Sequence, residues 1–310
     1  MAKKFRKRVA ISVGDLNGIG IEIALKAHNL IHKKIKPIYI IDKKMLKQAS
    51  QLLNLKIPKD FTTISPNAKY FKIKPGVVSK KSGLYSYKSF LRAIKLAKNK
   101  KVDAILTLPI HKEAWSKARV DYKGHTDMLR DIFKKDAIMM LGCNRMYVAL
   151  FSEHIPLKDV PKQVKTKKLT KFLLNLQNSL TPDSKVAILG LNPHAGDNGV
   201  LGDEEKKITK AIKKANTILN KEQFIGPVVP DIAFTKNFRK NFKYFVAMYH
   251  DQGLAPLKAL YFDESINVSL NLPILRVSVD HGTAFDIAYK NRELNLKSYL
   301  NAIEYIKESL

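Results

Sequence analysis

The chain has only one cysteine, Cys143, so it cannot form an intramolecular disulfide. Disulfides belong to oxidising compartments, and a chain without a cysteine pair fits a reducing one. No apolar run approaches the roughly 20 residues that a membrane-spanning helix needs. The apolar stretch after the basic start MAKKFRKR is too short for a secretory signal. We therefore expect a cytoplasmic protein that has no membrane partner.

Acidic residues are scarce, with 27 Asp and Glu against 56 Lys and Arg, which gives a formal net charge of +29. Such a charge can attract nucleic acid or small anions. However, the chain has no arginine-rich arm and no basic strand studded with aromatic residues, which are features of nucleic-acid binders. Its lysines are scattered along the helices that we expect. We interpret them as a solvated surface that weakly favours an anionic substrate, with no nucleic-acid partner.

The 310 residues, 45% of them hydrophobic, suffice for one large or two medium domains with a substantial core. Apolar strand-like runs alternate with segments of helical periodicity, which predicts an α/β fold. We expect strands at residues 8–13, 35–41, 102–108, 137–141, 146–151, 185–191, 245–248 and 275–279, with 137–151 forming a β-hairpin. We expect helices at residues 21–31, 43–53, 85–98, 128–133, 167–180 and 296–310, and one that begins near 203–205.

Local signatures for nucleotides and metals are missing. The first expected strand leads into a glycine loop, Gly14–Gly20, and then a helix, a layout that can cradle a phosphate. Its spacing is neither GxGxxG nor a P-loop, and a tight turn explains it about as well. No HExxH or CxxC occurs either. A metal site would therefore have to be assembled from residues that lie far apart in the sequence.

Histidines follow the apolar runs with unusual regularity. Of eight histidines, five come directly after expected strands: His111, His154, His194, His250 and His281. Any one of them is more often structural than a ligand. Several at the carboxyl ends of strands in one sheet would converge, however, and neutral imidazoles suit zinc and similar divalent ions. The pattern therefore predicts a metal site with three protein ligands and one open position.

Simpler explanations exist for the residues beside these histidines. In the stretch VAMYHDQGLAPLK, residues 246–258, His250 and Asp251 could merely hydrogen-bond a tight turn around Gly253. In the functional interpretation, Lys258 brings a cation to the same crevice if the loop folds back. In Gly-His-Thr-Asp, residues 124–127, the threonine or the aspartate could be a plain N-cap. The acidic residues 203–205 are more typical of helix capping than of catalysis.

Seven motifs, in this order, resemble the 4-hydroxythreonine-4-phosphate dehydrogenase family of vitamin B6 synthesis. The resemblance covers nearly the whole chain, from Arg8 to about Lys290. The motifs are GDLNGIGIE, LPIHKEAW, GHTD, EHIPL, NPHAGD, YHDQGLAPLK and LRVSVDHGTAFDIA. It implies a fold of the isocitrate/isopropylmalate dehydrogenase kind, which has two α/β lobes with a cleft between them. We expect the first lobe at residues 1–124 plus 282–310, and the second at 125–281.

The resemblance also implies roles for particular residues. His154, His194 and His250 would bind a divalent metal, drawn from both subunits of a homodimer, with zinc foremost and magnesium or cobalt as alternatives. Five further residues would hold the substrate: His125, Thr126, Lys258, Asn267 and Arg276. From the residue types themselves we add the hypothesis that His125 hydrogen-bonds the substrate or shuttles a proton, and that Asp251 orients His250 or acts as a base. NAD or NADP would accept the hydride at a site without a GxGxxG, whose residues we do not assign.

The sequence departs from the family pattern at a few positions. Leu16-Asn17 stand where the family has Pro-Ala, Ile21 where it has Pro, Glu153 where it has Thr, and Asp127 where it has Glu. The expected reaction is oxidation of 4-phosphonooxy-L-threonine followed by decarboxylation. Dehydrogenases of threonate or erythronate phosphates share these motifs and remain an alternative. A zinc-dependent phosphohydrolase that uses the same three histidines is a rival from another class.

Overall fold

The computed structural model describes residues 6–310. The first five residues, part of the basic start and of the expected first lobe, lie outside this range. The chain divides into two compact units, one formed by residues up to 134 together with 273–310, the other by residues 135–272. Residues 125–134 and 273–281, which we assigned to the second lobe, lie in the first unit. Strand β11 (Leu275–Val279) pairs there with β4 (Ala104–Thr107).

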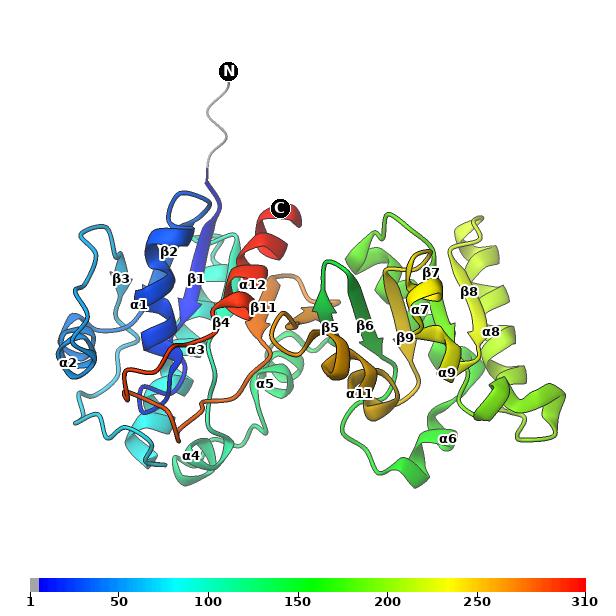
Figure 1. Ribbon diagram of the computed structural model, residues 1–310, viewed down its shortest axis with the longest axis horizontal. Helices are drawn as coiled ribbons and strands as arrows, with labels where there is room; N and C mark the ends of the chain where they lie inside the picture. The colour runs from blue at the N-terminus through cyan, green and yellow to red at the C-terminus, as the bar shows by residue number, and fades with distance from the viewer. Residues whose placement is uncertain (1–5) are drawn as a thin grey trace, which may run out of the picture. The chain divides into compact units, whose positions relative to one another are not determined.

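The first unit is built on a parallel sheet with the strand order β3-β2-β1-β4-β11 (Figure 1). Parallel strands that are covered on both faces read as continuous apolar runs, and Val9, Ala10 and Ile11 of β1 are fully buried. Its other strands are β1 (Arg8–Ser12), β2 (Lys36–Ile40) and β3 (Thr63–Ile64). Its helices are α1 (Gly20–Ile31), α2 (Lys43–Leu53), α3 (Lys80–Lys98), α4 (Lys112–Lys117), α5 (His125–Phe133) and α12 (Lys297–Glu308).

The second unit has a mixed sheet with the order β10-β5-β6-β9-β7-β8, in which β6, β9, β7 and β8 are parallel neighbours. Its strands are β5 (Ile138–Cys143), β6 (Met146–Leu150), β7 (Val186–Leu189), β8 (Phe224–Val228), β9 (Tyr244–Ala247) and β10 (Ile266–Leu270). Its α-helices are α6 (Val160–Gln163), α7 (Thr166–Leu180), α8 (Glu204–Leu219), α9 (Pro230–Ala233), α10 (Lys236–Arg239) and α11 (His250–Tyr261). A short 3₁₀ segment covers Leu157–Asp159, and Pro193–Gly199 forms a tightly turned stretch whose φ/ψ angles are not helical.

Most of the expected elements are present. The hairpin of β5 and β6 is confirmed, and α2 and β11 have the predicted bounds. Helix α3 begins at Lys80 rather than residue 85, because Ser79 caps it by accepting a hydrogen bond from the Ser82 amide. The short elements β3, α4, α6, α9 and α10 were not predicted. Three longer ones were also missed: β8, which contains Pro227 at the sheet edge, β10, and α11, which contains Gly253 and Pro256. Glycine and proline are poor helix formers, which explains the omission of α11.

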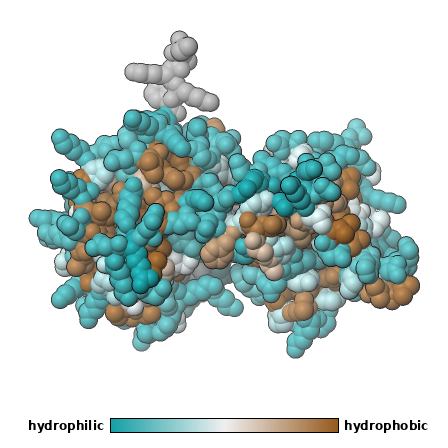
Figure 2. Space-filling view, in the orientation of Figure 1, coloured by the Kyte–Doolittle hydropathy of each residue, from teal (hydrophilic) through white to brown (hydrophobic). Residues whose placement is uncertain are grey.

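The surface fits the expected solvation of the lysines. Hydrophilic side chains cover most of the face shown in Figure 2. Within residues 6–310, every helix is too short or too polar to span a lipid bilayer. Trp115 is fully buried in the first unit and donates a hydrogen bond from Nε1 to Ser86 Oγ at 2.8 Å.

Candidate functional site

Three of the predicted histidines follow three adjacent parallel strands of the second unit. His154 comes shortly after β6, His250 directly after β9, and His194 shortly after β7. Strands β6 and β7 both pair in parallel with β9, so their carboxyl ends share one edge of the sheet. Ligands of open α/β sheets bind beyond this edge. The three histidines therefore lie in segments that leave the sheet at the edge where a binding site is expected.

His154 and His250 lie side by side, with their ring centroids 5.3 Å apart and their planes inclined by 44°. His250 is the first residue of α11, and its Nδ1 lies 2.8 Å from Oδ1 of Asp251. An ionised carboxylate only accepts hydrogen bonds, so this contact places the proton on Nδ1 and leaves Nε2 as a donor atom for a metal. Asp251 thus orients the imidazole of His250.

His194 occupies an unusual stretch of backbone. Residues 194–198 all have positive φ angles, between 41° and 80°, and four of the five are not glycine. Such conformations cost energy and persist only where the surroundings hold them. His194 does not form a group of three close ligand atoms with His154 and His250. Among residues 6–310, the group whose three ligand atoms lie within 4.8 Å of one another consists of His28, His32 and Asp60. The structure thus brings His154 and His250 together within one chain, but does not add His194 to them.

Gln252 ties the strand ends of this edge together. Its Oε1 accepts a hydrogen bond from the Met248 amide at 2.7 Å, and its Nε2 donates to the Gly190 carbonyl at 2.7 Å. Ser152 Oγ donates to the Met248 carbonyl at 2.6 Å. The segments that carry His154, His194 and His250 are therefore joined by one short hydrogen-bond network. Sequence reasoning missed Gln252, although an amide that can both donate and accept is suited to bridging two strand ends.

Glu205 holds the loop that leads to His194. Its Oε1 accepts hydrogen bonds from the amides of Leu191 and Asn192, both at 2.8 Å, and its Oε2 accepts one from Asn192 Nδ2 at 2.9 Å. Glu204 Oε2 also accepts from Asn192 Nδ2, and this bond lowers the pKa of the Glu204 carboxyl. The two glutamates lie in the first turn of α8, as expected, and in addition they hold this loop. They anchor a loop, because charge-assisted hydrogen bonds are strong.

Two other predicted residues meet in the first unit. Arg276, on β11, is only 2% exposed, and its Nη2 donates to Thr107 Oγ1 at 2.6 Å and lies 3.1 Å from His125 Nδ1. Burial lowers the pKa of Arg276 to about 9, so it still carries its charge at neutral pH. The pKa of His125 is held well below its usual range, by burial first and then by the charge of Arg276. His125 is therefore neutral.

The tautomer of His125 follows from its neighbour. Because the guanidinium only donates, Nδ1 of the neutral imidazole must accept, and the proton sits on Nε2. Among residues 6–310, this buried Nε2 has no hydrogen-bond partner. A buried donor without a partner costs about 1–3 kcal/mol. An oxygen of a bound anion would satisfy it, so His125 and Arg276 together offer donors to an anionic group.

The N-cap interpretation of Gly-His-Thr-Asp is wrong. Helix α5 begins at His125 after Gly124, and neither Thr126 nor Asp127 caps it by a side-chain hydrogen bond. Asp127 Oδ2 instead accepts from the Lys123 amide at 3.1 Å. The half-buried Thr126 lies in the first turn of α5, directly beside His125.

The turn expected around Gly253 is a helix. Residues 250–261 form α11, so Lys258 lies about 12 Å further along the helix axis than His250 rather than on a returning loop. Its Nζ lies 5.2 Å from the centre of the Phe262 ring. Gly253 is needed for packing, since a Cβ there would lie 2.5 Å from Cγ1 of Val148. Asn267, the other predicted substrate residue of this unit, lies on β10 opposite Leu141.

The glycine loop Gly14–Gly20 has the features of a structural turn. Asp15 is buried within it and accepts hydrogen bonds from the Asn17 amide at 2.9 Å and Ser82 Oγ at 3.1 Å. Asn17 in turn bonds to the backbone of Lys74 and Val77 and so fixes the irregular segment before α3. A buried carboxyl in this position does not favour a phosphate. Of the two interpretations, the tight turn describes the loop.

Comparison with known proteins gives consistent similarities. The family described as pyridoxal phosphate biosynthetic protein PdxA matches residues 33–306. A 4-hydroxythreonine-4-phosphate dehydrogenase from Sulfurimonas denitrificans is 66% identical over 96% of both chains, and one from Campylobacter fetus is 54% identical over 96% of both. A crystal structure of such an enzyme from Burkholderia phymatum superposes with a TM-score of 0.81 at 29% identity over 99% of both chains. The α/β fold expected from the sequence is confirmed.

Proposed function

The chain belongs to the PdxA family of pyridoxal phosphate biosynthetic proteins, and on this premise we propose that it acts as a 4-hydroxythreonine-4-phosphate dehydrogenase. The proposed reaction is oxidation of 4-phosphonooxy-L-threonine to a 3-keto acid. Loss of CO2 then gives 3-amino-1-hydroxyacetone phosphate. The observation that carries the proposal is the 66% identity, along nearly the full length, to a relative of that name.

We propose that His154, His194 and His250 hold a divalent metal, with zinc foremost and magnesium or cobalt as alternatives. The residue types fit, because the three imidazoles follow strands that share one edge and Asp251 leaves Nε2 of His250 unprotonated. A bound metal supplies Lewis-acid polarisation of the substrate oxygens. The chain's own contribution is to fix the imidazoles, through Gln252 and Glu205 among others.

His125 and Arg276 are proposed to bind an anionic group of the substrate. Their support is the buried pair described above, in which Nε2 of neutral His125 has no hydrogen-bond partner among residues 6–310 and the guanidinium retains its charge. Arg binds phosphate and carboxylate strongly, because several N–H groups point the same way. Thr126, Lys258 and Asn267 are proposed as further substrate contacts on the family resemblance alone.

NAD or NADP is proposed as the hydride acceptor, since a dehydrogenase of this family requires a nicotinamide cofactor. Its binding residues stay unassigned. The family resemblance further supports a homodimer in which the metal ligands come from both subunits. Such sharing would supply the third imidazole that a single chain does not bring to His154 and His250.

The test is a panel of phosphorylated hydroxy acids with NAD and with NADP, in which reduced cofactor is followed by its absorbance. We expect turnover of 4-phosphonooxy-L-threonine, loss of turnover with a chelator, and recovery when zinc, cobalt or magnesium is added. Faster turnover of threonate or erythronate phosphate would assign the chain to that related activity. Release of inorganic phosphate without cofactor reduction would instead indicate the hydrolase.

The ligand assignment has its own measurement. The His194→Ala variant should bind less metal per chain than the wild type and should lose reduction of the cofactor, while it keeps the thermal stability of the rest of the fold. If metal content and turnover both stay at the wild-type level, His194 is not a ligand.

A further inference from the structure

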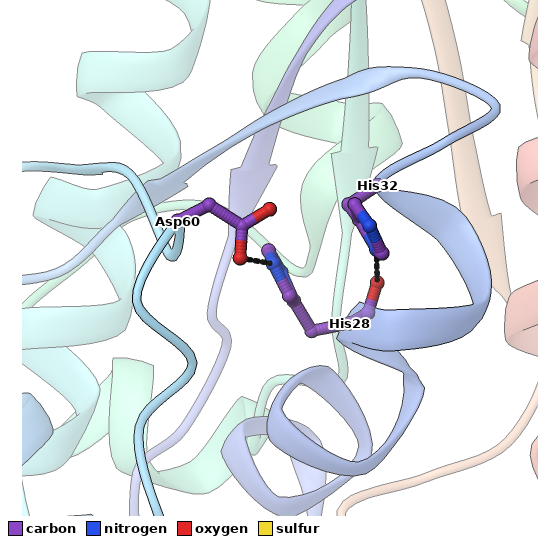
Figure 3. A group of neighbouring side chains, drawn as sticks. All are labelled: His28, His32 and Asp60. Atoms are coloured by element: carbon purple, nitrogen blue, oxygen red, sulfur yellow. Dashed lines mark hydrogen bonds and ion pairs between the residues drawn. The ribbon is translucent and has the colours of Figure 1, made fainter.

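A second group of potential metal ligands lies in the first unit, outside the residues of the proposed reaction. His28 and His32 stand one helical turn apart at the carboxyl end of α1, and Asp60 faces them from the segment after α2 (Figure 3). One ligand atom from each of the three residues lies within 4.8 Å of the other two. The rings of His28 and His32 are nearly parallel, with centroids 5.4 Å apart. His28 is fully buried, while Asp60 is exposed at 59% of its side chain.

The hydrogen bonds of His32 prepare it as a ligand. Its Nδ1 lies 3.2 Å from the backbone carbonyl of His28. A carbonyl only accepts, so Nδ1 carries the proton and Nε2 keeps its lone pair. This is the arrangement by which backbone carbonyls orient metal-bound histidines in proteins.

His28 has a partner on each ring nitrogen. Nε2 lies 3.0 Å from Asp60 Oδ1, and Nδ1 lies 3.0 Å from the hydroxyl of Tyr39. The fully buried Tyr39 side chain carries a phenol hydroxyl, which can donate or accept. The hydroxyl can therefore support either tautomer of His28. Without a cation, Nε2 of His28 donates to Asp60 and Nδ1 accepts from the Tyr39 hydroxyl. A cation at Nε2 takes the place of that proton, and Nδ1 then donates to Tyr39.

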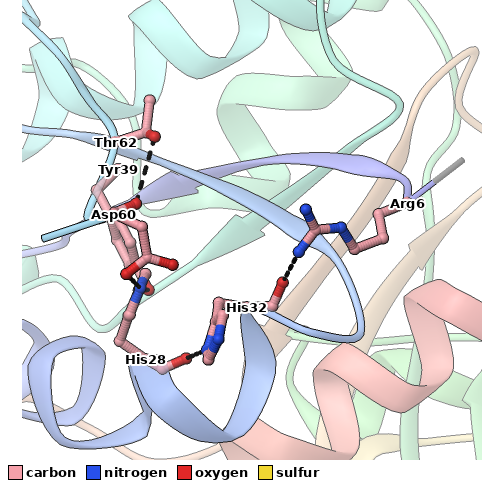
Figure 4. Close-up of polar contacts among 6 residues, drawn as sticks. All are labelled: Arg6, His28, His32, Tyr39, Asp60 and Thr62. Carbon is pink, nitrogen blue, oxygen red and sulfur yellow. Dashed lines mark hydrogen bonds and ion pairs between the residues drawn. The ribbon is translucent and has the colours of Figure 1, made fainter. Parts of the chain in front are cut away.

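The electrostatic surroundings of the cluster include two features that favour a cation. The carbonyl end of a helix carries partial negative charge, and both histidines lie at that end of the 12-residue helix α1. The carboxyl group of Asp60 adds an acidic side chain, with Oδ1 3.0 Å from Nε2 of His28. Arg6 is a nearby positive group, and its guanidinium binds the backbone carbonyl of His32, as Figure 4 shows.

We propose that His28, His32 and Asp60 form a second divalent-metal site that binds zinc through two imidazoles and one carboxylate. Two nitrogens and one oxygen are a ligand set that zinc accepts, with water in the fourth position. Zinc–ligand distances of about 2.0–2.2 Å require the three atoms to draw closer together, and the exposed side chain of Asp60 is free to make most of that movement. The bound ion pins the segment around Asp60 to the end of α1.

The site is independent of the proposed dehydrogenase reaction, because its ligands belong to the first unit and the three catalytic-site histidines belong to the second. Its effect is on stability. A ligand that binds only the folded state stabilises it in proportion to the logarithm of its concentration over Kd. Saturating zinc should therefore raise the thermal midpoint even when the dehydrogenase site is absent.

The experiment starts from a full-length His154→Ala/His250→Ala variant, which lacks two proposed ligands of the other site. The metal-free protein is titrated with zinc by equilibrium dialysis, and its thermal midpoint is measured with and without zinc. We expect one zinc ion per chain and a higher midpoint. Adding Asp60→Asn or His32→Gln should weaken zinc binding at least about tenfold and abolish the midpoint shift, as expected for loss of a ligand.

The substitutions are chosen to separate metal binding from a purely structural contact. An asparagine at position 60 can still accept the hydrogen bond from Nε2 of His28, so the fold around the cluster is kept while a good ligand is lost. Asp121→Asn, on the exposed surface of the same unit, is the matched control for the change in charge. The proposal is overturned if the starting variant binds no zinc, or if Asp60→Asn and His32→Gln bind it as tightly as Asp121→Asn.

Discussion

At the scale of single residues, Asp15 makes the clearest prediction. Burial raises its pKa to about 6, against 3.8 for an exposed aspartate. The folded chain therefore holds this proton more tightly than the unfolded chain. Stability from this group is present below pH 3.8 and is lost as the pH rises through about 6, where the ionised carboxyl costs about 3 kcal/mol. Asp15→Asn should remove that cost, because the amide oxygen can still accept from Asn17.

The measurement is the difference in unfolding free energy between Asp15→Asn and the wild type, taken by urea denaturation from pH 4 to 8. The difference should grow in favour of the variant up to about pH 6 and then level off. Other titrating groups are common to both proteins and cancel. A difference that is constant over this range would show that Asp15 titrates normally.

The residues of the candidate site were predictable to different degrees. Each histidine after an apolar run could be predicted as a candidate, because a polar imidazole directly follows a segment that is expected to be buried. Gln252 and Glu205 gave no such signal, since their roles depend on which loops the fold places beside them. Nε2 of His125, which has no hydrogen-bond partner within the described range 6–310, could not be foreseen, because this requires knowing that Arg276 contacts the other ring nitrogen.

At the scale of elements, α11 shows how packing overrides local preference. Gly253 lies inside this helix, where an alanine would ordinarily be more stable by roughly 0.5–1 kcal/mol. A Cβ would, however, lie 2.5 Å from Cγ1 of Val148 and 2.8 Å from Cβ of Ala247. Gly253→Ala should therefore destabilise the chain by about 1–3 kcal/mol. It should also weaken metal binding, because the helix that begins with His250 must move away from β6 and β9.

Thermal unfolding and metal titration of three variants test this account. Gly282→Ala is the control, since nothing lies within 4 Å of a Cβ at that position, and it should leave stability nearly unchanged. In the Val148→Ala background the effect of Gly253→Ala should shrink, because the clashing methyl group is gone. If the two substitutions are strictly additive, the contact with Val148 does not explain the glycine.

The same helix marks the limit of prediction at this scale. Elements with regular periodicity, such as α2 and β11, were predicted to the residue. Helix α11 was not, because Gly253 and Pro256 disfavour a helix locally and only the sheet beneath explains the glycine. Strand β8 was missed for a similar reason, since Pro227 is tolerated there only at the edge of the sheet.

At the scale of the whole molecule, the order of seven motifs identified the family from the sequence alone, and the match over residues 33–306 agrees. The resemblance implied that both subunits supply ligands, but it did not predict which histidines one chain brings together. His154 and His250 are neighbours in one chain, whereas His194 is not part of a three-ligand group among residues 6–310. A site that combines one chain's His154 and His250 with His194 of a second copy accounts for both facts.

Mixing inactive variants tests this sharing. If the ligands are divided in that way, a dimer of one His194→Ala chain and one His250→Ala chain has one site with both defects and one site with none. Random re-association should then restore about a quarter of the wild-type turnover, since half the dimers are mixed and each has one intact site.

The matched control mixes His154→Ala with His250→Ala. These two residues lie in the same chain's half of the site, so both sites stay defective and no turnover returns. If neither mixture recovers turnover, each chain builds its metal site alone. If both mixtures recover turnover, the His154 and the His250 of one metal site come from different chains.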